Sequence, residues 1–282
     1  MLKKLQEIAY QAGQAIMEIY NSEDFNVEVK GDGSPLTRAD KAAHLVIAEG
    51  LEKHFREIPV LSEEGKNIPY ETRKNWRTFF LVDPLDGTKE FIKRNGEFTV
   101  NIALIEEGNP IAGVVYAPVL GTMYAAEIDA SGKWQLETRN LQPETCNQNP
   151  KTDTPIPQHP NTPYKIVASR SHNNELTEAF IEEKRKEFGT VEIVPMGSSL
   201  KICLVAEGKA DVYPRLGPTM EWDTAAAHAI ALAAGCTVLE HESNTPLTYN
   251  KENLLNPFFI VERGLDNGLK TGSKGFSSSS LH

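Results

Sequence analysis

The sequence has few cysteines and no long apolar run. Three of its 282 residues are cysteine, and no two of them have the C-x-x-C spacing of a redox or metal motif. An odd number of scattered cysteines fits a reduced, cytoplasmic setting, with peripheral association at the inner face of the cell membrane left open. No apolar stretch approaches the roughly 18 residues of a transmembrane helix. Polar residues between positions 6 and 14 also interrupt the apolar segment that a signal peptide needs.

Positive charge is also scarce. Lysine and arginine number 29 against 39 acidic residues, which gives a formal net charge of -10 and a pI of about 5.3. This balance argues against nucleic acid or an anionic membrane as the main partner. A small anionic ligand stays compatible with it, because a bound metal ion reverses the local field. The glycine-rich phosphate loops G-x-x-x-x-G-K-[ST] and G-x-G-x-x-G do not occur in the chain.

The most informative segment is residues 78–88, T-F-F-L-V-D-P-L-D-G-T. An apolar, strand-forming run ends there in two carboxylates, a proline and a glycine. The pattern predicts a buried strand that carries Asp83 at its carboxyl end and a tight turn that carries Asp86. These carboxylates and the intervening Leu85 carbonyl are hard oxygen donors, which suit Mg²⁺ better than Zn²⁺ or Cu²⁺. The alternative is structural, since Asp-Pro and Asp-Gly are common turn dipeptides.

Acidic residues elsewhere in the chain allow two interpretations. Asp40 follows Thr37 at the spacing of a capping box, and Asp223 precedes an alanine-rich helix, so both could be helix caps. Glu63 and Glu64 directly follow an apolar strand at 58–61, where α/β proteins place ligands, although paired glutamates are usually solvated surface charge.

Hydrophobic periodicity predicts an α/β protein of the α+β type. Helices are expected at about 2–19 and 37–55, and an antiparallel meander of strands follows between 98 and 136. The second half alternates strand and helix, with its last helix expected to run through Ala234 and Gly235 to follow the helix end. We therefore expect an N-terminal domain at 1–138, a polar linker at 139–163, a substrate domain at 164–263 and a flexible tail at 264–282.

Three motifs resemble a known family. D-P-L-D-G-T at 83–88, T-R-A-D at 37–40 and W-D-T-A-A at 222–226 resemble signatures of the Mg²⁺-dependent, lithium-sensitive phosphomonoesterases, which include inositol monophosphatase and 3′(2′),5′-bisphosphate nucleotidase. The extension at 89–98 resembles the nucleotidase branch in particular. Ala227 departs from the glycine often found there, but it removes no ligand. The resemblance spans about residues 2–261, apart from the polar linker.

The resemblance implies a layered α/β/α/β/α sugar-phosphatase fold with two subdomains. It implies hydrolysis of the 3′-phosphate of adenosine 3′,5′-bisphosphate to AMP and phosphate, a reaction linked to sulfate assimilation. The expected cofactor is Mg²⁺, as two ions or with a third, and Li⁺ should inhibit by replacing one of them. The expected partner is a small nucleotide bisphosphate, and the sequence leaves monomer and homodimer equally open.

The resemblance also implies roles for individual residues. The metal ligands would be Glu63, Asp83, the Leu85 carbonyl, Asp86 and Asp223. Proton removal from the attacking water would involve Asp40, Glu64 and Thr88. Substrate contacts would come from Glu63, Gly87, Thr88, Ser169, His172, Gly197, Ser198, Lys201, Arg215 and Asp223.

Some of these residues also have structural interpretations. Residues 197–199 precede a helix, so their backbone N–H groups suit a phosphate, and Arg215 is a candidate clamp for the phosphate that is not cleaved. Thr88 could instead be a helix N-cap, His172 an ordinary loop residue, and Lys201 and Arg215 plain surface charges.

Two other functions compete with a nucleotidase. An inositol monophosphatase or another sugar phosphatase would share the metal site and differ in the region 197–215. A non-catalytic nucleotide-binding sensor would not need the set of acidic residues that activates water.

Overall fold

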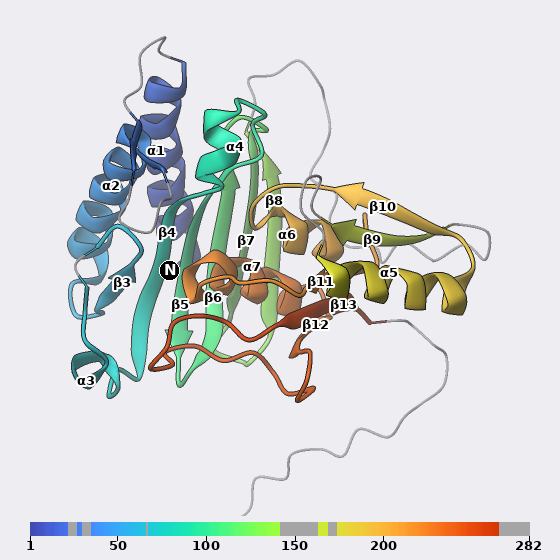
Figure 1. Cartoon of the computed structure of the whole chain (residues 1–282). Coiled ribbons are helices and arrows are strands. Elements are labelled where there is room, and N and C mark those ends of the chain that lie inside the picture. The colour runs from blue at the N-terminus through green and yellow to red at the C-terminus, as the bar shows by residue number, and fades with distance from the viewer. Residues whose placement is uncertain (22–26, 30–34, 66, 142–162, 169–173, 265–282) are drawn as a thin grey trace, which may run out of the picture.

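The structure is a computed structural model, and it describes residues 1–21, 27–29, 35–65, 67–141, 163–168 and 174–264. Its helices and strands form five layers (Figure 1). From the N-terminal side these are a helix pair, a six-stranded sheet, a second helix pair, a five-stranded sheet and a single helix. This confirms the expected layered α/β/α/β/α fold.

The outer helix pair is α1 (Leu2–Tyr20) and α2 (Arg38–Phe55). The apolar stripe of α1 is buried against the first sheet, as the helical spacing of its residues predicts. The second helix begins one residue later than expected. Thr37 instead ends the short strand β2 (Pro35–Thr37), which pairs with β1 (Val27–Val29).

The first sheet has the order β3-β4-β5-β6-β7-β8. Its strands are β3 (Val60–Ser62), β4 (Thr78–Asp86), β5 (Thr99–Glu106), β6 (Asn109–Ala117), β7 (Thr122–Ile128) and β8 (Trp134–Asn140). Strand β3 is parallel to β4 and every later pair is antiparallel, so the predicted meander is confirmed. Strand β8 runs past the boundary expected at position 138.

Strand β4 differs from the prediction at its end. The strand continues to Asp86 instead of turning after Asp83. Asp83 pairs with Asn101 and Asp86 pairs with Thr99. The four residues 83–86 of β4 therefore lie opposite only three residues, 99–101, of β5. The extra residue is a β-bulge at Pro84 and Leu85, and a bulge suits proline because proline has no N–H to donate. Side chains three apart on a regular strand face opposite sides, so the bulge turns both aspartates to one side.

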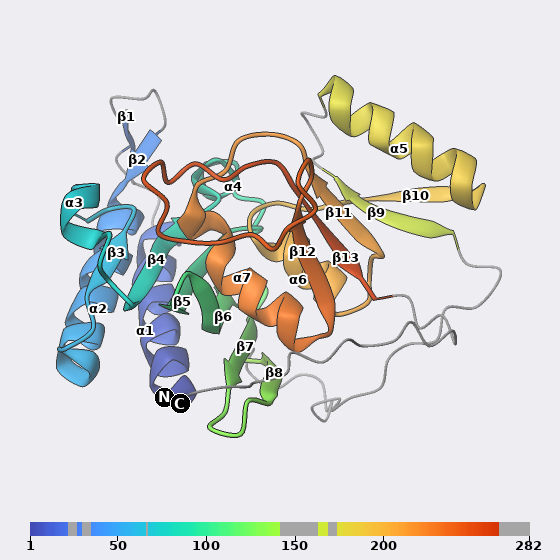
Figure 2. The same ribbon diagram turned by 90° about the horizontal axis from the view of Figure 1, so that it is seen from below.

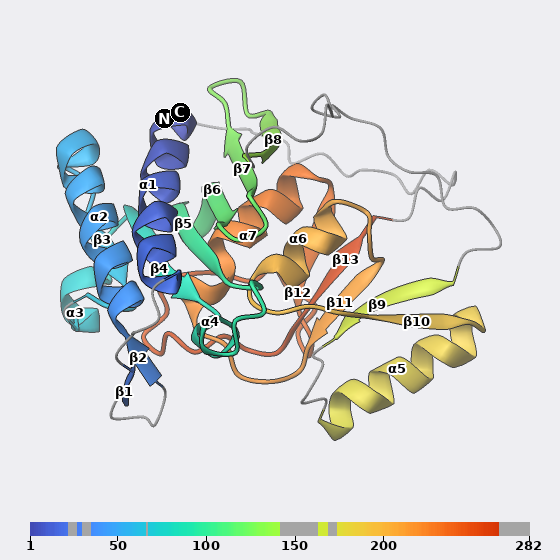
Figure 3. The ribbon, with the colours of Figure 1, turned by 90° about the horizontal axis from the view of Figure 1, so that it is seen from above.

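The middle layer is α6 (Leu200–Ala206) and α7 (Glu221–Ala233), which lie between the two sheets in the views from below and above (Figures 2 and 3). The alanines of α7 allow a close approach to β6. A Cβ added at Gly113 would come within 2.3 Å of the Ala226 carbonyl oxygen. The buried cluster around α7 includes residues of both sheets, so the two halves of the chain share one core.

The second sheet has the order β10-β9-β11-β13-β12. Its strands are β9 (Tyr164–Ala168), β10 (Val191–Pro195), β11 (Val212–Arg215), β12 (Cys236–Glu240) and β13 (Phe259–Arg263). Helix α5 (Glu175–Phe188) covers its outer face. Two short helices, α3 (Tyr70–Arg73) and α4 (Thr88–Ile92), flank β4. Among the helices of the described segments, none combines the length and apolarity needed to cross a membrane.

Candidate active site

A pocket of about 550 Å³ opens where the end of β4, the start of α4 and the start of α7 meet. It is lined by Glu63, Asp83, Leu85, Asp86, Gly87, Thr88, Lys89, Glu90, Pro218, Thr219, Met220, Asp223 and Leu255. All five residues expected to supply metal ligands are in this set, although they come from three separate parts of the sequence. The same pocket contains Gly87 and Thr88, which were expected to contact the substrate.

A backbone N–H orients one oxygen of each aspartate in the pocket. Asp83 Oδ1 accepts from Leu85 N at 3.0 Å, and Asp223 Oδ2 accepts from Met220 N at 2.9 Å. Asp86 Oδ2 accepts from Ser199 N at 2.5 Å. Asp223 is the third residue of α7, so it caps the helix start and lines the pocket at the same time.

The turn after Asp86 depends on glycine. Gly87 has φ of 92°, in the left-handed region, and it is the residue that precedes α4. Thr88 is therefore the first residue within α4, and its interpretation as an N-cap is wrong. Its hydroxyl donates to the Leu85 carbonyl at 3.5 Å, and its side chain lines the pocket.

Burial and mutual repulsion raise the pKa values of the three aspartates. For Asp83, which is 1 % exposed, burial acts first and the charges of its acidic neighbours add to it, so its pKa lies well above the usual range. Burial raises the pKa of Asp86 to about 6. Burial and then the Asp86 charge raise the pKa of Asp223 to about 8.

Such a cluster fits a divalent cation. Five carboxylates line the pocket, the four expected metal ligands and Glu90, together with the Leu85 carbonyl; all are hard oxygen donors, and the negative charge of the carboxylates is costly unless a cation offsets it. Within the described residues, no three histidine, cysteine, aspartate or glutamate side chains already converge as a closed metal site. The fit to Mg²⁺ therefore depends on the donor chemistry and the shared pocket.

These pKa values predict how metal-free stability depends on pH. Folded Asp86 and Asp223 keep protons above the ordinary pKa of 3.8, whereas the unfolded chain loses them there. The unfolding free energy should therefore fall as the pH rises from about 4 through the folded values near 6 and 8. Thermal unfolding in a chelator should show this fall, and the Asp223→Asn variant should show less of it. Mg²⁺ should raise the midpoint more at pH 8 than at pH 5.5, and equal Mg²⁺ effects at both would contradict the expectation.

The remaining acidic candidates lie around the pocket. Glu63 N donates to the Val82 carbonyl at 3.1 Å, which places the loop after β3 beside the end of β4. Glu64 is half-buried in that loop but is not part of the pocket lining. Asp40, 1 % exposed in the first turn of α2, is also outside the lining, but its charge contributes to the raised pKa of Asp83.

The turn before α6 packs directly on the turn after β4. A Cβ added at Gly87 would be 3.3 Å from the Ser198 Cβ, and one added at Gly197 would be 2.8 Å from the Glu90 Cγ. One expectation for this turn needs correction. The backbone N–H of Ser199, expected to be available to a phosphate, donates to the Asp86 carboxylate.

Two basic side chains, Lys201 and Arg215, lie near the pocket without lining it. The Lys201 charge opposes the stronger effect of burial on the pKa of Asp86, and the Arg215 charge does the same at Asp223. Arg215 Nη2 donates to the Pro218 carbonyl at 2.6 Å, and its Nε is buried without a hydrogen-bond partner in the described part of the chain. The expected substrate residues Ser169 and His172 lie outside the described residues.

Sequence reasoning missed the support behind Asp86. Ser199 Oγ is 2.8 Å from Thr99 Oγ1 and 2.9 Å from Asn101 Oδ1, and all three side chains are buried. They tie the turn before α6 to strand β5. The available signal was the pair of polar residues on alternate positions of an otherwise apolar strand.

Comparison with known proteins gives a consistent result. Residues 1–264 match the inositol monophosphatase family. The chain is 49 % identical over 263 residues to the 3′(2′),5′-bisphosphate nucleotidase CysQ of Salmonella typhimurium, covering 93 % of this chain and 99 % of that protein. CysQ of Escherichia coli K12 is 48 % identical with the same coverage.

Solved structures agree with the fold. The crystal structure of CysQ from Bacteroides thetaiotaomicron, a bacterial member of the inositol monophosphatase family, is similar with a TM-score of 0.80 and 47 % identity. The match covers 93 % of this chain and 96 % of that one. The extragenic suppressor protein suhB from Bartonella henselae shares the fold at 23 % identity and a TM-score of 0.69, covering 93 % of both chains. By sequence over nearly its whole length and by fold, this chain belongs to the inositol monophosphatase family.

Proposed function

We propose that the chain is a Mg²⁺-dependent phosphomonoesterase that hydrolyses the 3′-phosphate of adenosine 3′,5′-bisphosphate to AMP and phosphate. The observation that carries the proposal is the single pocket lined by Glu63, Asp83, Leu85, Asp86 and Asp223. The identity of 47–49 % to proteins named 3′(2′),5′-bisphosphate nucleotidase supports this choice of substrate. Its cellular role would be to clear this nucleotide during sulfate assimilation in the cytoplasm.

The five lining residues would hold two Mg²⁺ ions or three. When bound, Mg²⁺ supplies charge that stabilises an in-line phosphoryl transfer and makes water acidic. The backbone N–H bonds to Asp83, Asp86 and Asp223 fix one oxygen of each carboxylate before any ion binds. This preorganisation lowers the reorganisation needed when the ions bind.

Thr88 would take the proton from the attacking water, and the carboxylate of Glu64 or Asp40 would take a proton from Thr88. The Thr88 hydroxyl lines the pocket and donates to the Leu85 carbonyl, so it would accept the water proton only as its own proton moves from that carbonyl to the Glu64 or Asp40 carboxylate. Asp40 is buried and its charge acts on Asp83, which places it beside the cluster of expected metal ligands.

Substrate selection would come from the second half of the chain. Lys201 and Arg215 add positive charge at the edge of an acidic pocket, which favours a ligand with a second phosphate. The Arg215 guanidinium, which already donates to the Pro218 carbonyl of the pocket lining, would donate to that phosphate. Ser169 and His172 would contact the nucleotide, and both remain predictions.

A phosphate-release assay tests the proposal. We expect faster release from adenosine 3′,5′-bisphosphate than from inositol 1-phosphate, because only the nucleotide offers a second phosphate to Arg215 and Lys201. Release should require Mg²⁺ and be inhibited by Li⁺. The reverse substrate order would make the chain an inositol or sugar phosphatase, and nucleotide binding without release would make it a sensor.

A further inference from the structure

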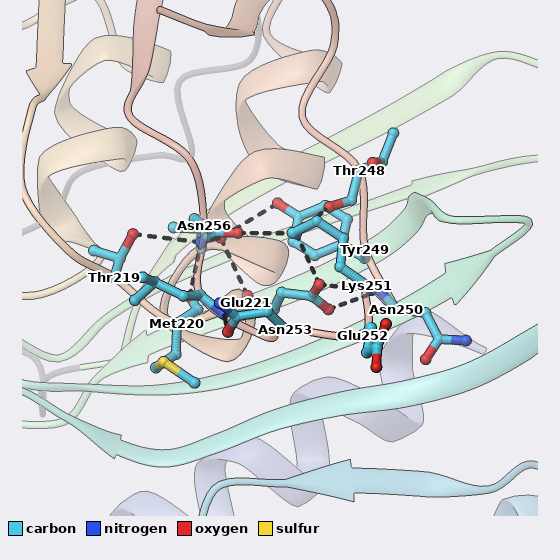
Figure 4. Close-up of polar contacts among 12 residues, drawn as sticks. Thr219, Met220, Glu221, Thr248, Tyr249, Asn250, Lys251, Glu252, Asn253 and Asn256 are labelled. Carbon is cyan, nitrogen blue, oxygen red and sulfur yellow. Dashed lines mark hydrogen bonds and ion pairs between the residues drawn. The ribbon is translucent and has the colours of Figure 1, made fainter. Parts of the chain in front are cut away.

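The first turn of α7 is covered by a segment to which none of the roles above is assigned. This segment, residues 248–256 (the clamp), crosses the start of the helix (Figure 4). Glu221 N donates to the Leu254 carbonyl at 2.9 Å, and Asn256 N donates to the Thr219 carbonyl at 2.8 Å. The clamp is thus bonded to the backbone on both sides of the helix start.

Within this contact, Glu221 is a fully buried carboxylate. It accepts hydrogen bonds from Asn250 N at 2.7 Å and Lys251 N at 2.9 Å, and the Lys251 ammonium lies 2.7 Å from its Oε1 (Figure 4). A buried charge is tolerated only when it is paired and hydrogen-bonded. These donors all belong to the clamp, so a displacement of the clamp would take them away from the buried Glu221 charge.

The clamp also reaches the residue that orients Asp223. Asn256 Nδ2 donates to the Met220 carbonyl at 2.8 Å and to Thr224 Oγ1 at 3.0 Å. The N–H of Met220 is the group that donates to Asp223 Oδ2. That N–H and the Thr219 carbonyl bound by Asn256 N belong to one peptide unit, so a displacement of the clamp would move the group that positions the Asp223 carboxylate.

The other side of the clamp is bound to the N-terminal half of the chain. Arg73 of α3, 2 % exposed, donates to the carbonyls of Lys251 at 2.7 Å and Glu252 at 2.9 Å. It also donates to Asn250 Oδ1 at 2.8 Å, and Asn250 Nδ2 donates back to the Arg73 carbonyl at 2.8 Å. The clamp thus joins α3, which precedes β4 in the chain, to α7.

We propose that Arg73, Glu221 and Lys251 are positioning residues for the metal site. They hold Asp223 of one half of the chain in register with Asp83 and Asp86 of the other half, and so set the affinity for the divalent cation. None of the three lines the pocket. The inference rests on the metal site of the proposed function.

The test is a direct titration with Mn²⁺, followed by calorimetry, on the full chain and its Lys251→Met variant. Methionine keeps an unbranched stem and removes the charge. We expect the dissociation constant for Mn²⁺ to rise about tenfold, in the range seen when residues that orient metal ligands are changed. The control is Lys184→Met, because Lys184 is also partly buried but lies on α5, against Phe180 and Phe188. The Lys184→Met variant should have a lower midpoint of unfolding than wild type, while its Mn²⁺ affinity stays at the wild-type value.

A second variant separates positioning from stability. Glu221→Gln combined with Lys251→Met leaves no unpaired buried charge, and we expect it to regain part of the Mn²⁺ affinity lost in Lys251→Met alone. Unchanged Mn²⁺ affinity in Lys251→Met, together with a lower unfolding midpoint, would overturn the proposal, because the clamp would then serve stability only. If Lys251→Met does not fold, wild-type affinity in Glu221→Gln would overturn it equally. Wild-type protein that binds no Mn²⁺ would instead refute the metal site itself.

Discussion

Asp86→Asn is expected to lower Mg²⁺-dependent phosphate release by about 10³-fold or more, equivalent to about 4 kcal/mol in the barrier. The change replaces a negatively charged metal ligand in the pocket lining with a neutral one. Asparagine has the same shape and still offers an oxygen to Ser199 N, so the turn before α6 should keep its place. The loss should therefore appear in turnover and not in the fold.

Circular dichroism and thermal unfolding would check the fold of this variant. In a chelator at about pH 8, Asp86→Asn should be at least as stable as wild type, because it removes a buried carboxylate whose pKa is raised to about 6. A matched control is Asp129→Asn, the same change in the turn after β7, outside the pocket lining. It should retain wild-type turnover. More than a tenth of wild-type turnover in Asp86→Asn would contradict the assigned role of Asp86.

Arg215→Met is expected to lower kcat/KM for adenosine 3′,5′-bisphosphate about 100-fold, or about 2.7 kcal/mol, the size of a lost charge-assisted hydrogen-bond pair. For adenosine 3′-monophosphate the loss should be small, because that substrate has no second phosphate for the guanidinium to bind. Comparing both substrates on both proteins isolates the contact between Arg215 and the uncleaved phosphate.

The exposed Arg56 of α2, paired with Glu52, provides the control for a lost arginine charge. Arg56→Met should leave both substrates unaffected. Equal losses on the bisphosphate and the monophosphate in Arg215→Met would mean that Arg215 supports the helix start or Asp223 and does not select the substrate. The hydrogen bond from Arg215 to the Pro218 carbonyl is the contact through which Arg215 would then support the helix start.

The sequence predicted the elements whose pattern is local. The stripe of α1 follows from one face meeting the core, so the position of that helix was predictable. The position of β5 was also predictable from its alternating residues, although the structure buries both faces of this strand. The bulge in β4 was not, because a turn and a bulge use the same proline-containing string. Only the pairing of Asp83 and Asp86 with β5 distinguishes them.

Within the site, the acidic residues could be identified from their motifs, but their supports could not. Ser199 holds Asp86 from 113 residues away in sequence, and Asn256 holds Met220, whose N–H orients Asp223, from a loop with no periodic pattern. Such contacts depend on tertiary packing. They also explain why the N–H of Ser199 was wrongly expected to be available to a phosphate.

The most direct test of the central claim is a crystal structure of the protein grown with Mn²⁺, with the ions located by anomalous diffraction. The account predicts at least two cation peaks within coordination distance of oxygens from Glu63, Asp83, Leu85, Asp86 and Asp223. A structure in which these carboxylates turn toward separate regions, with no anomalous peak among them, would contradict it.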